Sequence, residues 1–407
     1  MPSAAMPESS RSSPADACDL VVVGAGAAGM MCAAVAAQRG RRVVLIEHAR
    51  RIGEKIRISG GGRCNFTNVS TGPRHYVGRD PEFAAQALGA YTPRDFVALV
   101  RRHRIAFHEK HRGQLFCDHA SSAIVDMLRA ECERGGVRWL HPCRVHALRP
   151  GPRGFELDTD AGALRSARVV VATGGLPVAA IGATDWALRL ARSLGLDVEP
   201  PRPALVPLRF VAEDFAPFAQ LAGVALQVRA SCEGASFDED LLFTHRGLSG
   251  PAVLQVSSYW EPGRALGLDL GCGTDLAGLL RQAQQGSRQS LLGVLAQVLP
   301  RRLAQAWLDQ QGLDGARRVA ETGRAALERL AGALSAWSPR VAGTEGWNKA
   351  EVMRGGVATH ELDPRSLEAR RVPGLHFIGE AVDITGWLGG YNFQWAWASA
   401  HAAARSV

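Results

Sequence analysis

Lysine is scarce in this chain of 407 residues. Lys55, Lys110 and Lys349 are its lysines, so arginine supplies most of the positive charge behind a formal net charge of +8. A basic protein can bind nucleic acid when its cations gather against the phosphates. Apart from residues 101–104, however, the arginines stand singly or in pairs among acidic residues. The sequence therefore disfavours nucleic acid as a partner.

Paired cysteines are missing as well. The eight cysteines form no C-x-x-C or C-x-x-x-x-C pair, so the sequence predicts neither a metal site nor a redox dithiol. The chain begins with no apolar signal segment, and residues 1–17, rich in proline, serine and alanine, are expected to form a disordered tail. We therefore expect a cytoplasmic protein whose thiols are reduced.

A long uninterrupted hydrophobic run is also lacking. The most apolar stretch, residues 20–37, is interrupted by Gly24, Gly26 and Gly29. Glycines at this spacing are typical of a buried strand, a tight turn and a helix rather than of a membrane span. The sequence therefore predicts no membrane partner.

What the chain does contain is a complete G-x-G-x-x-G at residues 24–29, after an apolar strand expected at residues 19–23. Such a largely β-branched strand is typical of a parallel strand buried on both faces. Gly24 permits a tight turn, Gly26 lets the backbone approach a pyrophosphate, and Gly29 allows close packing of helix on strand. The helix that follows directs its positive N-terminus at the phosphates.

An acidic residue follows at the spacing that such a site requires. Gly40 ends the helix, residues 42–46 form the second expected strand, and Glu47 closes it. A carboxylate at this position accepts hydrogen bonds from ribose hydroxyls, and it disfavours the 2′-phosphate of NADP. The pattern therefore predicts a dinucleotide site that binds FAD or NAD.

A second glycine-rich segment favours FAD. Residues 52–68 combine three consecutive glycines, at residues 60–62, with the cations of Lys55, Arg57 and Arg63. Exposed backbone amides and cations together suit a long anionic cofactor. A flexible surface loop is the alternative interpretation, although such a loop has little need of arginine, cysteine and asparagine in close succession.

Two later segments are expected to complete the site. The strand at residues 167–171 leads into Ala-Thr-Gly-Gly, whose glycines leave room for a cofactor. Residues 372–380 form a strand with an acid after glycine, so Glu380 or Asp383 can bind the ribityl hydroxyls. The N-terminus of the helix expected at residues 393–405 can stabilise negative charge on the pyrimidine end of a reduced flavin. Both ends of the chain thus meet at one cofactor.

Six sequence blocks carry a family resemblance: GAGAAG, SGGGRCNFTN, the ATGG strand, LFTHRGLSGPAVLQVSS, MRGGVATHELDP and GLHFIGEAVDITGWLGGYNFQWAWASA. They span nearly the whole chain after the tail. With these blocks the sequence resembles the bacterial NAD(P)/FAD-dependent oxidoreductases of the aminoacetone-oxidase type. The resemblance implies bound FAD and a domain inserted between two halves of the nucleotide-binding domain. Residues 176–186 depart from the more polar turn of that family.

Motifs and resemblance together give one set of candidate cofactor-binding residues, in which the backbone of Val145 is expected to meet the adenine. The set comprises the residues of the glycine-rich segments, the acids that follow the strands, and their immediate neighbours. Its members are Gly24, Gly26, Ala27, Ala28, Gly29, Glu47, His48, Lys55, Ser59, Gly60, Gly61, Gly62, Arg63, Cys64, Asn65, Val145, Ala172, Thr173, Gly174, Gly379, Glu380, Asp383, Gly390, Tyr391, Asn392 and Phe393.

The fold class expected from these features is α/β, with a two-dinucleotide-fold, Rossmann-like FAD-binding domain interrupted by an inserted domain. Short apolar segments followed by apolar residues at helical spacing predict that the insertion contains a small sheet or barrel and a helical part. Residues 200–203, rich in proline, are expected to form a stiff join. The expected ranges are 18–197 and 344–407 for the FAD-binding domain and 198–343 for the insertion, with its β part at about 198–256 and its helical part at about 275–338.

Catalytic residues are marked less clearly. His245 can act as a general acid or base or orient a substrate carbonyl, although a hydrogen-bonded structural histidine in a tight turn is slightly favoured. Cys64 can face the flavin, but without a partner cysteine a packed thiol is favoured. His360, which follows a Gly-Gly turn and precedes Pro364, lies either near the active site or in a surface hairpin.

The main hypothesis is an FAD-dependent oxidoreductase that transfers hydride between a small organic substrate, or NAD(P)H, and bound FAD. The sequence has no second G-x-G-x-x-G, so NAD(P)H is expected to dock transiently near the flavin. Two alternatives stay open: a flavoprotein that acts on RNA, as in tRNA modification, and a non-catalytic FAD-bearing redox sensor. These motifs do not specify the substrate, the electron acceptor or the oligomeric state.

Overall fold

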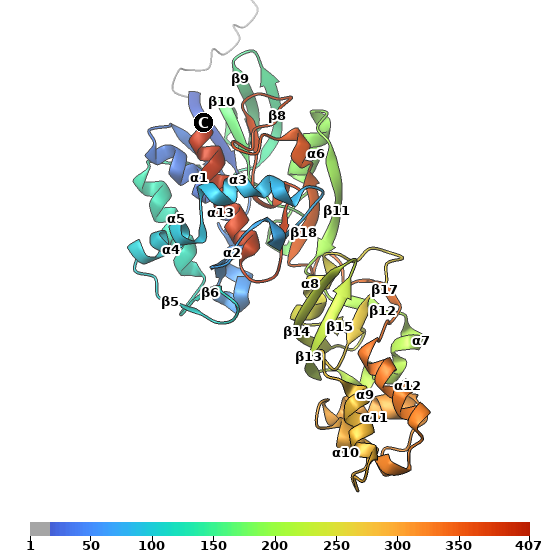
Figure 1. The fold of residues 1–407 in the computed structure, drawn as a ribbon. Helices are drawn as coiled ribbons and strands as arrows, with labels where there is room; N and C mark the ends of the chain where they lie inside the picture. Colours follow the sequence, from blue (N-terminus) through green and yellow to red (C-terminus); the bar gives the residue numbers. More distant parts are fainter. Residues whose placement is uncertain (1–16) are drawn as a thin grey trace, which may run out of the picture.

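The computed structural model describes residues 17–407, which form two connected parts (Figure 1). The disordered tail expected at residues 1–17 lies outside the described residues, except for Ala17, the first residue of β1 (Ala17–Val23). Strands and helices are mixed in both parts, as the expected α/β class requires. Among residues 17–407, no helix is both long enough and apolar enough to cross a membrane.

The first part is built on a central sheet in which β1 pairs in parallel with β2 (Val43–Ile46) and β10 (Gly162–Val171). The valines of β1 and β2 are buried, because helices or loops cover both faces of these strands. The strand order is β7-β2-β1-β10-β9-β8, and β19 also pairs with β10. The other strands are β7 (Arg138–Leu140), β8 (Val145–Gly151), β9 (Gly154–Thr159) and β19 (Leu375–Phe377).

Helices from opposite ends of the chain pack together beside this sheet. α1 (Ala27–Gln38) contacts α13 (Tyr391–Ser406), and the many alanines of both helices allow a close approach. Trp395 and Trp397 of α13 are buried in the same core. The remaining helices of this part are α2 (Glu54–Ile58), α3 (Ala85–Ala90), α4 (Pro93–Arg102), α5 (Ser122–Arg134) and α6 (Trp186–Ser193).

Two smaller sheets belong to the first part, and Figure 1 shows β5 and β6 at its lower end. In one of them, β6 lies between β3 and β5. In the other, β4 pairs with β20, which joins a segment near the N-terminus to one near the C-terminus. Their strands are β3 (Asn65–Asn68), β4 (Tyr76–Val77), β5 (Phe107–Glu109), β6 (Gln114–Cys117) and β20 (Thr385–Gly386).

The lower part of Figure 1 is an insertion with a hydrophobic core of its own. Its sheet has the strand order β16-β13-β14-β15-β12-β17. The strands are β12 (Leu208–Phe210), β13 (Ala225–Cys232), β14 (Ala235–Phe243), β15 (Gly247–Ser249), β16 (Gly267–Asp269) and β17 (Val341–Thr344). The helices are α7 (Ala212–Phe215), α8 (Pro251–Ser257), α9 (Leu276–Gln284), α10 (Leu291–Leu295), α11 (Arg301–Gln310) and α12 (Arg324–Ser335).

Two antiparallel strands connect the parts: β11 (Val198–Ala204) leads into the insertion, and β18 (Val352–Val357) leads out of it. The sequence predicts a stiff join at residues 200–203, but these residues belong to β11. The pairing register shifts between Glu199 and Arg202. Because prolines cannot donate to a strand ladder, they are tolerated where the ladder is irregular.

Candidate functional site

The glycine-rich turn after β1 lies against the end of β10. Gly24 has φ +104°, and a Cβ there would lie 2.6 Å from the carbonyl oxygen of Ala172, so glycine is required. A Cβ on Gly29 would lie 1.7 Å from the oxygen of Gly24, which shows how tightly α1 packs on the turn. At Gly26, in contrast, a Cβ would meet no atom within 4 Å. The turn therefore leaves open space at the N-terminus of α1, where a phosphate can bind.

Glu47 follows β2 and holds this turn directly. Its Oε2 accepts a hydrogen bond from the amide of Ala25 at 2.7 Å, and its Oε1 accepts one from the amide of Ala49 at 2.7 Å. Oε1 also lies 3.1 Å from Nδ1 of His48. Burial alone would raise the pKa of the Glu47 carboxyl, but the bonds from His48, Ala49 and Ala25 outweigh it and lower the pKa. The side chain is therefore an anion beside the turn.

A cavity of about 420 Å³ opens at the carboxyl ends of β1, β2 and β10. The predicted Gly24, His48, Val145 and Thr173 line it together. This edge of an open parallel sheet is where nucleotides bind in doubly wound α/β folds. The sequence analysis missed several polar and aromatic lining residues, because they lie in segments without a recognisable motif: Arg144, His146, Thr184, Trp186 and Arg189.

One hydroxyl at this cavity has no hydrogen-bond partner. The Oγ1 atom of Thr173 is buried, and no described residue donates to it or accepts from it. An unpaired buried polar atom costs about 1–3 kcal/mol, so native proteins rarely keep one without a function. A polar ligand in the cavity would complete the bond. The residues present therefore fit the nucleotide end of FAD.

Lys55 and Glu380 meet although they are 325 positions apart along the chain. The Nζ atom of Lys55 lies 2.5 Å from Oε2 of Glu380, and Oε1 of Glu380 accepts a hydrogen bond from the amide of Met353 at 2.8 Å. A Cβ on Gly174 would lie 3.5 Å from the same carboxylate. Three candidates from three separate motifs thus lie together at the end of β10.

The segment after β19 places the other C-terminal candidates. Gly379 lies against Ala28 of α1, because a Cβ on Gly379 would stand 3.0 Å from the Cβ of Ala28. Asp383 is buried and accepts a hydrogen bond from the amide of Arg79 at 2.9 Å. Burial raises the pKa of the Asp383 carboxyl. Gly379 thus packs against the start of α1, whereas the Asp383 carboxylate accepts a hydrogen bond from the backbone just after β4.

The predicted glycine-rich loop is a short 3-10 turn, Ser59–Gly62, between α2 and β3. Gly61 and Gly62 have open space where a Cβ would stand, so their backbone is accessible to a ligand. A Cβ on Gly60, in contrast, would meet the ring of Phe116 at 2.9 Å. The carbonyl of Arg63 accepts a hydrogen bond from the amide of Cys117 at 3.0 Å. Strand β6 therefore packs against the loop and stabilises its position.

The N-terminus of α13 lies against β3. A Cβ on Gly390 would stand 2.5 Å from the carbonyl oxygen of Thr67 and 2.8 Å from Oδ1 of Asn65. The Asn392 amide closes the preceding turn, since Oδ1 accepts from the amide of Gly386 and Nδ2 donates to its carbonyl, each at 2.8 Å. The candidates Asn65 and Gly390 are thus in contact, while the side chain of Asn392 is engaged within the protein.

Aromatic side chains join the two parts near this helix terminus. Nε1 of Trp387 donates a hydrogen bond to the hydroxyl of Tyr259 at 2.7 Å, and the Trp387 ring lies edge-on to Phe237 at 4.9 Å. His75 stacks on Tyr391 at 4.6 Å and meets Trp387 at 5.2 Å. We call these five residues the aromatic bridge. The sequence analysis missed it because its members come from four unconnected segments.

Two of the catalytic candidates, His245 and Cys64, lie in different environments. His245 is exposed in the turn between β14 and β15, and Thr244 makes the hydrogen bonds of that turn with Gly247. The structural role that the sequence favoured for His245 therefore belongs to Thr244. Cys64 is fully buried, and burial raises the pKa of its thiol well above the ordinary value. Cys64 is thus a packed thiol.

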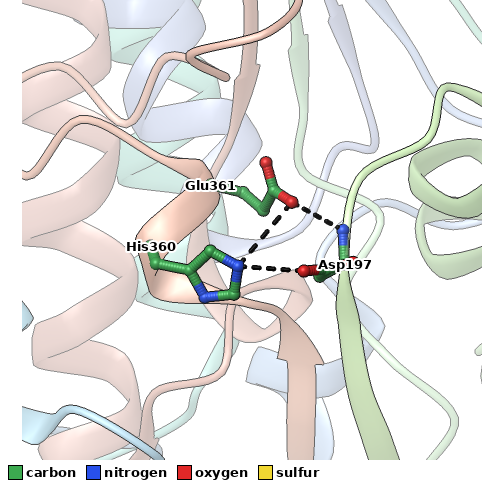
Figure 2. A group of neighbouring side chains, drawn as sticks. All are labelled: Asp197, His360 and Glu361. Atoms are coloured by element: carbon green, nitrogen blue, oxygen red, sulfur yellow. Dashed lines mark hydrogen bonds and ion pairs between the residues drawn. The ribbon is translucent and has the colours of Figure 1, made fainter.

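His360, the third candidate, follows β18 and lies beside Asp197, the residue that precedes β11 (Figure 2). Its Nε2 is 3.0 Å from Oδ2 of Asp197, and Glu361 accepts a hydrogen bond from the Asp197 amide at 2.9 Å. These three residues have the types that can hold a metal ion. The guanidinium of Arg371, however, binds both carboxylate oxygens of Glu361. The cluster is therefore an ion-pair group that fixes the start of β11.

A family model for HI0933-like protein Rossmann domains matches residues 18–406. The chain belongs to the HI0933-like family. Two relatives of the chain are each named "Ribosomal RNA dihydrouridine synthase". The protein from Escherichia coli (strain K12) is 46% identical over 391 residues, with 96% of this chain and 98% of that protein covered. The protein from Haemophilus influenzae is 41% identical over 394 residues, with coverages of 95% and 98%.

A third relative has a different substrate in its name. The 3-dehydro-bile acid delta(4,6)-reductase of Clostridium scindens is 30% identical over 405 residues, with 95% of this chain and 98% of that protein covered. All three relatives are covered almost completely, and their names describe synthase or reductase activities. The HI0933-like chain is an FAD-dependent oxidoreductase, as the sequence predicts.

Two expectations about its partners are wrong. The sequence analysis expects a small organic substrate and disfavours nucleic acid, whereas the two most similar of these relatives are named for ribosomal RNA. The physical reason lies in how charge was judged. Scattering of arginine along the chain says little about which cations the fold brings onto one surface. The alternative of an RNA-acting flavoprotein agrees better with the relatives.

Proposed function

We propose that this protein reduces uridine to dihydrouridine in ribosomal RNA with FAD as its cofactor. The observation that carries the proposal is the nearly full-length similarity to two ribosomal RNA dihydrouridine synthases, at 46% and 41% identity. Similarity over the whole length includes the insertion as well as the Rossmann part. The bile-acid reductase is less similar, at 30%, and gives less support to a steroid substrate.

The chemistry fits a flavin site. Dihydrouridine differs from uridine by saturation of the C5–C6 double bond, so its formation needs a hydride and a proton. Bound FAD supplies the hydride after it has been reduced. The protein must therefore hold the cofactor, bring an unpaired uridine beside it, keep water from the site and deliver the proton. As with other enzymes acting on nucleobases, the base must leave its stack to reach the site.

Different groups of candidate residues would bind different parts of the cofactor. The turn at Gly24 and Gly26 would hold the pyrophosphate, and Glu47 and Thr173 would bind the adenosine end beside Val145. The remaining candidates would line the flavin end, where the Lys55–Glu380 pair, the Ser59–Gly62 loop and the N-terminus of α13 lie. In this proposal residues 18–197 and 344–407 form the cofactor domain, and residues 198–343 cover its flavin end.

A nicotinamide donor is the proposed source of the electrons. The Rossmann part has one glycine-rich dinucleotide turn, and the bound FAD would occupy it. NADH or NADPH would therefore reduce the flavin from a transient position near the isoalloxazine and leave before RNA enters. Reduction of FAD by a nicotinamide consumes one hydride, which is the hydride that one uridine later receives.

The test is a reconstituted reaction. Purified protein, FAD, NADH or NADPH and ribosomal RNA transcribed in vitro are incubated together, and nucleosides are analysed by mass spectrometry. We expect dihydrouridine at a specific position of the transcript. Transfer RNA and 3-oxo steroids serve as competing substrates. Reduction of a steroid with no dihydrouridine in any RNA would contradict the proposal.

A further inference from the structure

A basic hairpin lies beside the proposed flavin loop. We use this name for residues 101–119, which include the end of α4, β5 and β6. The first twelve of these residues contain a single acid, Glu109, and the cations listed here: Arg101, Arg102, Arg104, Lys110 and Arg112. Histidines stand among them. Cations that are separated in sequence therefore share one projecting element of the fold.

Some of these charges are already paired and anchor the hairpin. Arg102 lies 3.0 Å from the Glu131 carboxylate on α5, and His103 lies 2.6 Å from it. At the tip, Arg112 binds Oε1 of Glu239 and the carbonyl oxygen of Asp238, both at 2.6 Å. Because Asp238 and Glu239 belong to β14, the hairpin is fastened to the insertion as well as to the first part.

Other cations of the hairpin have no acidic partner among residues 17–407. Arg101, Arg104 and Lys110 are exposed and form no ion pair there. Arg101 lies 5.8 Å from the ring centre of Phe107, and Lys110 lies 5.4 Å from that of Phe116. Aromatic rings beneath a cation hold its side chain without neutralising the charge. These three cations are therefore available to a phosphate.

The face of the hairpin that carries Lys110 is continuous with the proposed flavin loop. His108 pairs with Phe116 across the β5–β6 ladder, and their rings stack at 6.3 Å. Lys110, the residue that follows β5, lies over the same ring. The Phe116 ring contacts the backbone at Gly60, and Gly61 beyond it is open. Ile58, which precedes the loop, has 49% of its surface exposed. Lys110 and the loop thus border one surface.

We propose that the basic hairpin binds the phosphate backbone of the substrate RNA and so positions the target uridine at the flavin loop. Arg101, Arg104 and Lys110 contact phosphates, while the paired Arg102 and Arg112 keep the hairpin rigid. The ligand class is single-stranded or looped RNA, since a base that reaches the flavin must be unpaired. This inference rests on the proposed function and adds the surface that recognises its substrate.

The test compares Lys110→Ala and the double variant Arg101→Ala/Lys110→Ala with Arg153→Ala. Arg153 is a matched control because it is an exposed arginine at the tip of the β8–β9 hairpin, at the opposite end of the first part (Figure 1). Binding of a ribosomal RNA transcript is measured at several salt concentrations. Each phosphate contact contributes about 0.7–0.9 to the slope of log affinity against log salt.

We expect Lys110→Ala to reduce the salt slope by about 0.7–0.9 and the double variant to reduce it by about twice that amount. The control keeps the wild-type slope, and the visible spectrum shows equal FAD content in all four proteins. Equal slopes for the hairpin variants and the wild type would overturn the inference.

Dihydrouridine formation by the same proteins separates this inference from the proposed function. If the wild type forms no dihydrouridine, the proposed function fails and the inference fails with it. If the wild type forms dihydrouridine and the hairpin variants form it with unchanged KM for RNA, the function stands and the hairpin is not the recognition surface. A raised KM with nearly unchanged kcat is the result that the inference predicts.

Discussion

The Thr173 hydroxyl gives the sharpest residue-scale test of the cofactor site. Among residues 17–407 this buried oxygen has no hydrogen-bond partner. We therefore expect Thr173→Val to leave the stability of the FAD-free protein unchanged or slightly higher. The same substitution should weaken FAD binding by about 0.5–1.5 kcal/mol, the usual net value of one hydrogen bond. Titration of the apoprotein with FAD measures the affinity, and urea unfolding measures the stability.

Thr67→Val is the matched control for that substitution. The Thr67 hydroxyl is also buried, but it donates to Oε1 of Gln394 at 2.6 Å. Its removal should lower the stability of the FAD-free protein by about 1–3 kcal/mol, because an acceptor on α13 is left unpaired. If Thr173→Val and Thr67→Val destabilise the apoprotein equally, Thr173 has no reserved role in cofactor binding.

The Glu47–His48 contact predicts a pH dependence. A hydrogen bond to Glu47 is the main cause that raises the pKa of His48 above its ordinary value of 6.5. The stability that His48 adds is therefore complete below pH 6.5 and is lost as pH rises through the raised pKa. The pKa of Glu47 lies below its ordinary value of 4.5, so its contribution is present above pH 4.5 and is lost in acid.

We expect His48→Gln to destabilise the protein more at about pH 5.5 than at about pH 8.5, because the ion pair is formed below pH 6.5 and is lost as pH rises through the raised pKa of His48. Urea unfolding of both proteins at the two pH values measures the difference. A destabilisation that does not change with pH would mean that His48 stays neutral in the folded protein.

For single residues, the sequence predicts which ones lie near the candidate site better than it predicts their hydrogen bonds. Gly24 and Glu47 are predicted by short motifs that fix local turns, whereas Val145, which lines the same cavity as Gly24, is implied by the family resemblance. The use of Asn392 inside its own turn, and of Thr244 instead of His245, depends on side-chain geometry that no motif describes.

At the scale of elements, the hydrogen bond between Trp387 and Tyr259 links the segment before α13 to the insertion. Tyr259→Phe should lower the free energy of unfolding by about 0.5–1.5 kcal/mol, since one hydrogen bond is lost while the ring remains. It should also alter turnover if the link sets the position of the insertion over the flavin. Urea unfolding and steady-state kinetics measure the two effects.

Tyr91→Phe provides the comparison. The Tyr91 ring is buried against His401, and no described residue forms a hydrogen bond with its hydroxyl. Its removal should change stability by less than about 0.5 kcal/mol. Equal effects of the two substitutions would show that the Trp387 link contributes nothing specific.

The elements that were predictable from sequence are those with local signals. Strand β1, helix α1 and strand β2 follow from the spacing of glycines and apolar residues over some thirty positions. Strand β11 was misjudged because its prolines argue against a strand, while its partner β18 lies about 150 residues later. The aromatic bridge cannot be predicted for the same reason, because its contacts form between segments that are distant in sequence.

At the scale of the whole molecule, the cofactor should stabilise a domain that is assembled from both ends of the chain. α1 and α13 pack together, and the proposed contacts come from both. Free FAD at about 100 times its Kd should therefore raise the free energy of unfolding by about 2.7 kcal/mol. Thermal unfolding with increasing FAD measures this effect, and an unfolding temperature independent of FAD would contradict it.

The whole-molecule property that sequence reasoning misjudged is the distribution of charge. The formal net charge of +8 comes from arginines spread along the chain, and that spacing wrongly predicts that nucleic acid is not a partner. Folding places residues 101–112 on one hairpin beside the proposed flavin loop. Ion pairs within the protein neutralise only some of the cations of this hairpin. Which cations stay free is decided by tertiary contacts to Glu131 and Glu239.

The most direct test of the central claim is an anaerobic transfer of reducing equivalents from the flavin to RNA. The FAD-loaded protein is reduced with a stoichiometric donor, unmodified ribosomal RNA is added, and the flavin spectrum is followed. The account predicts that the oxidised spectrum returns and that one dihydrouridine forms for each flavin reoxidised. A flavin that stays reduced with RNA, yet is reoxidised by a small unsaturated organic compound, would contradict it.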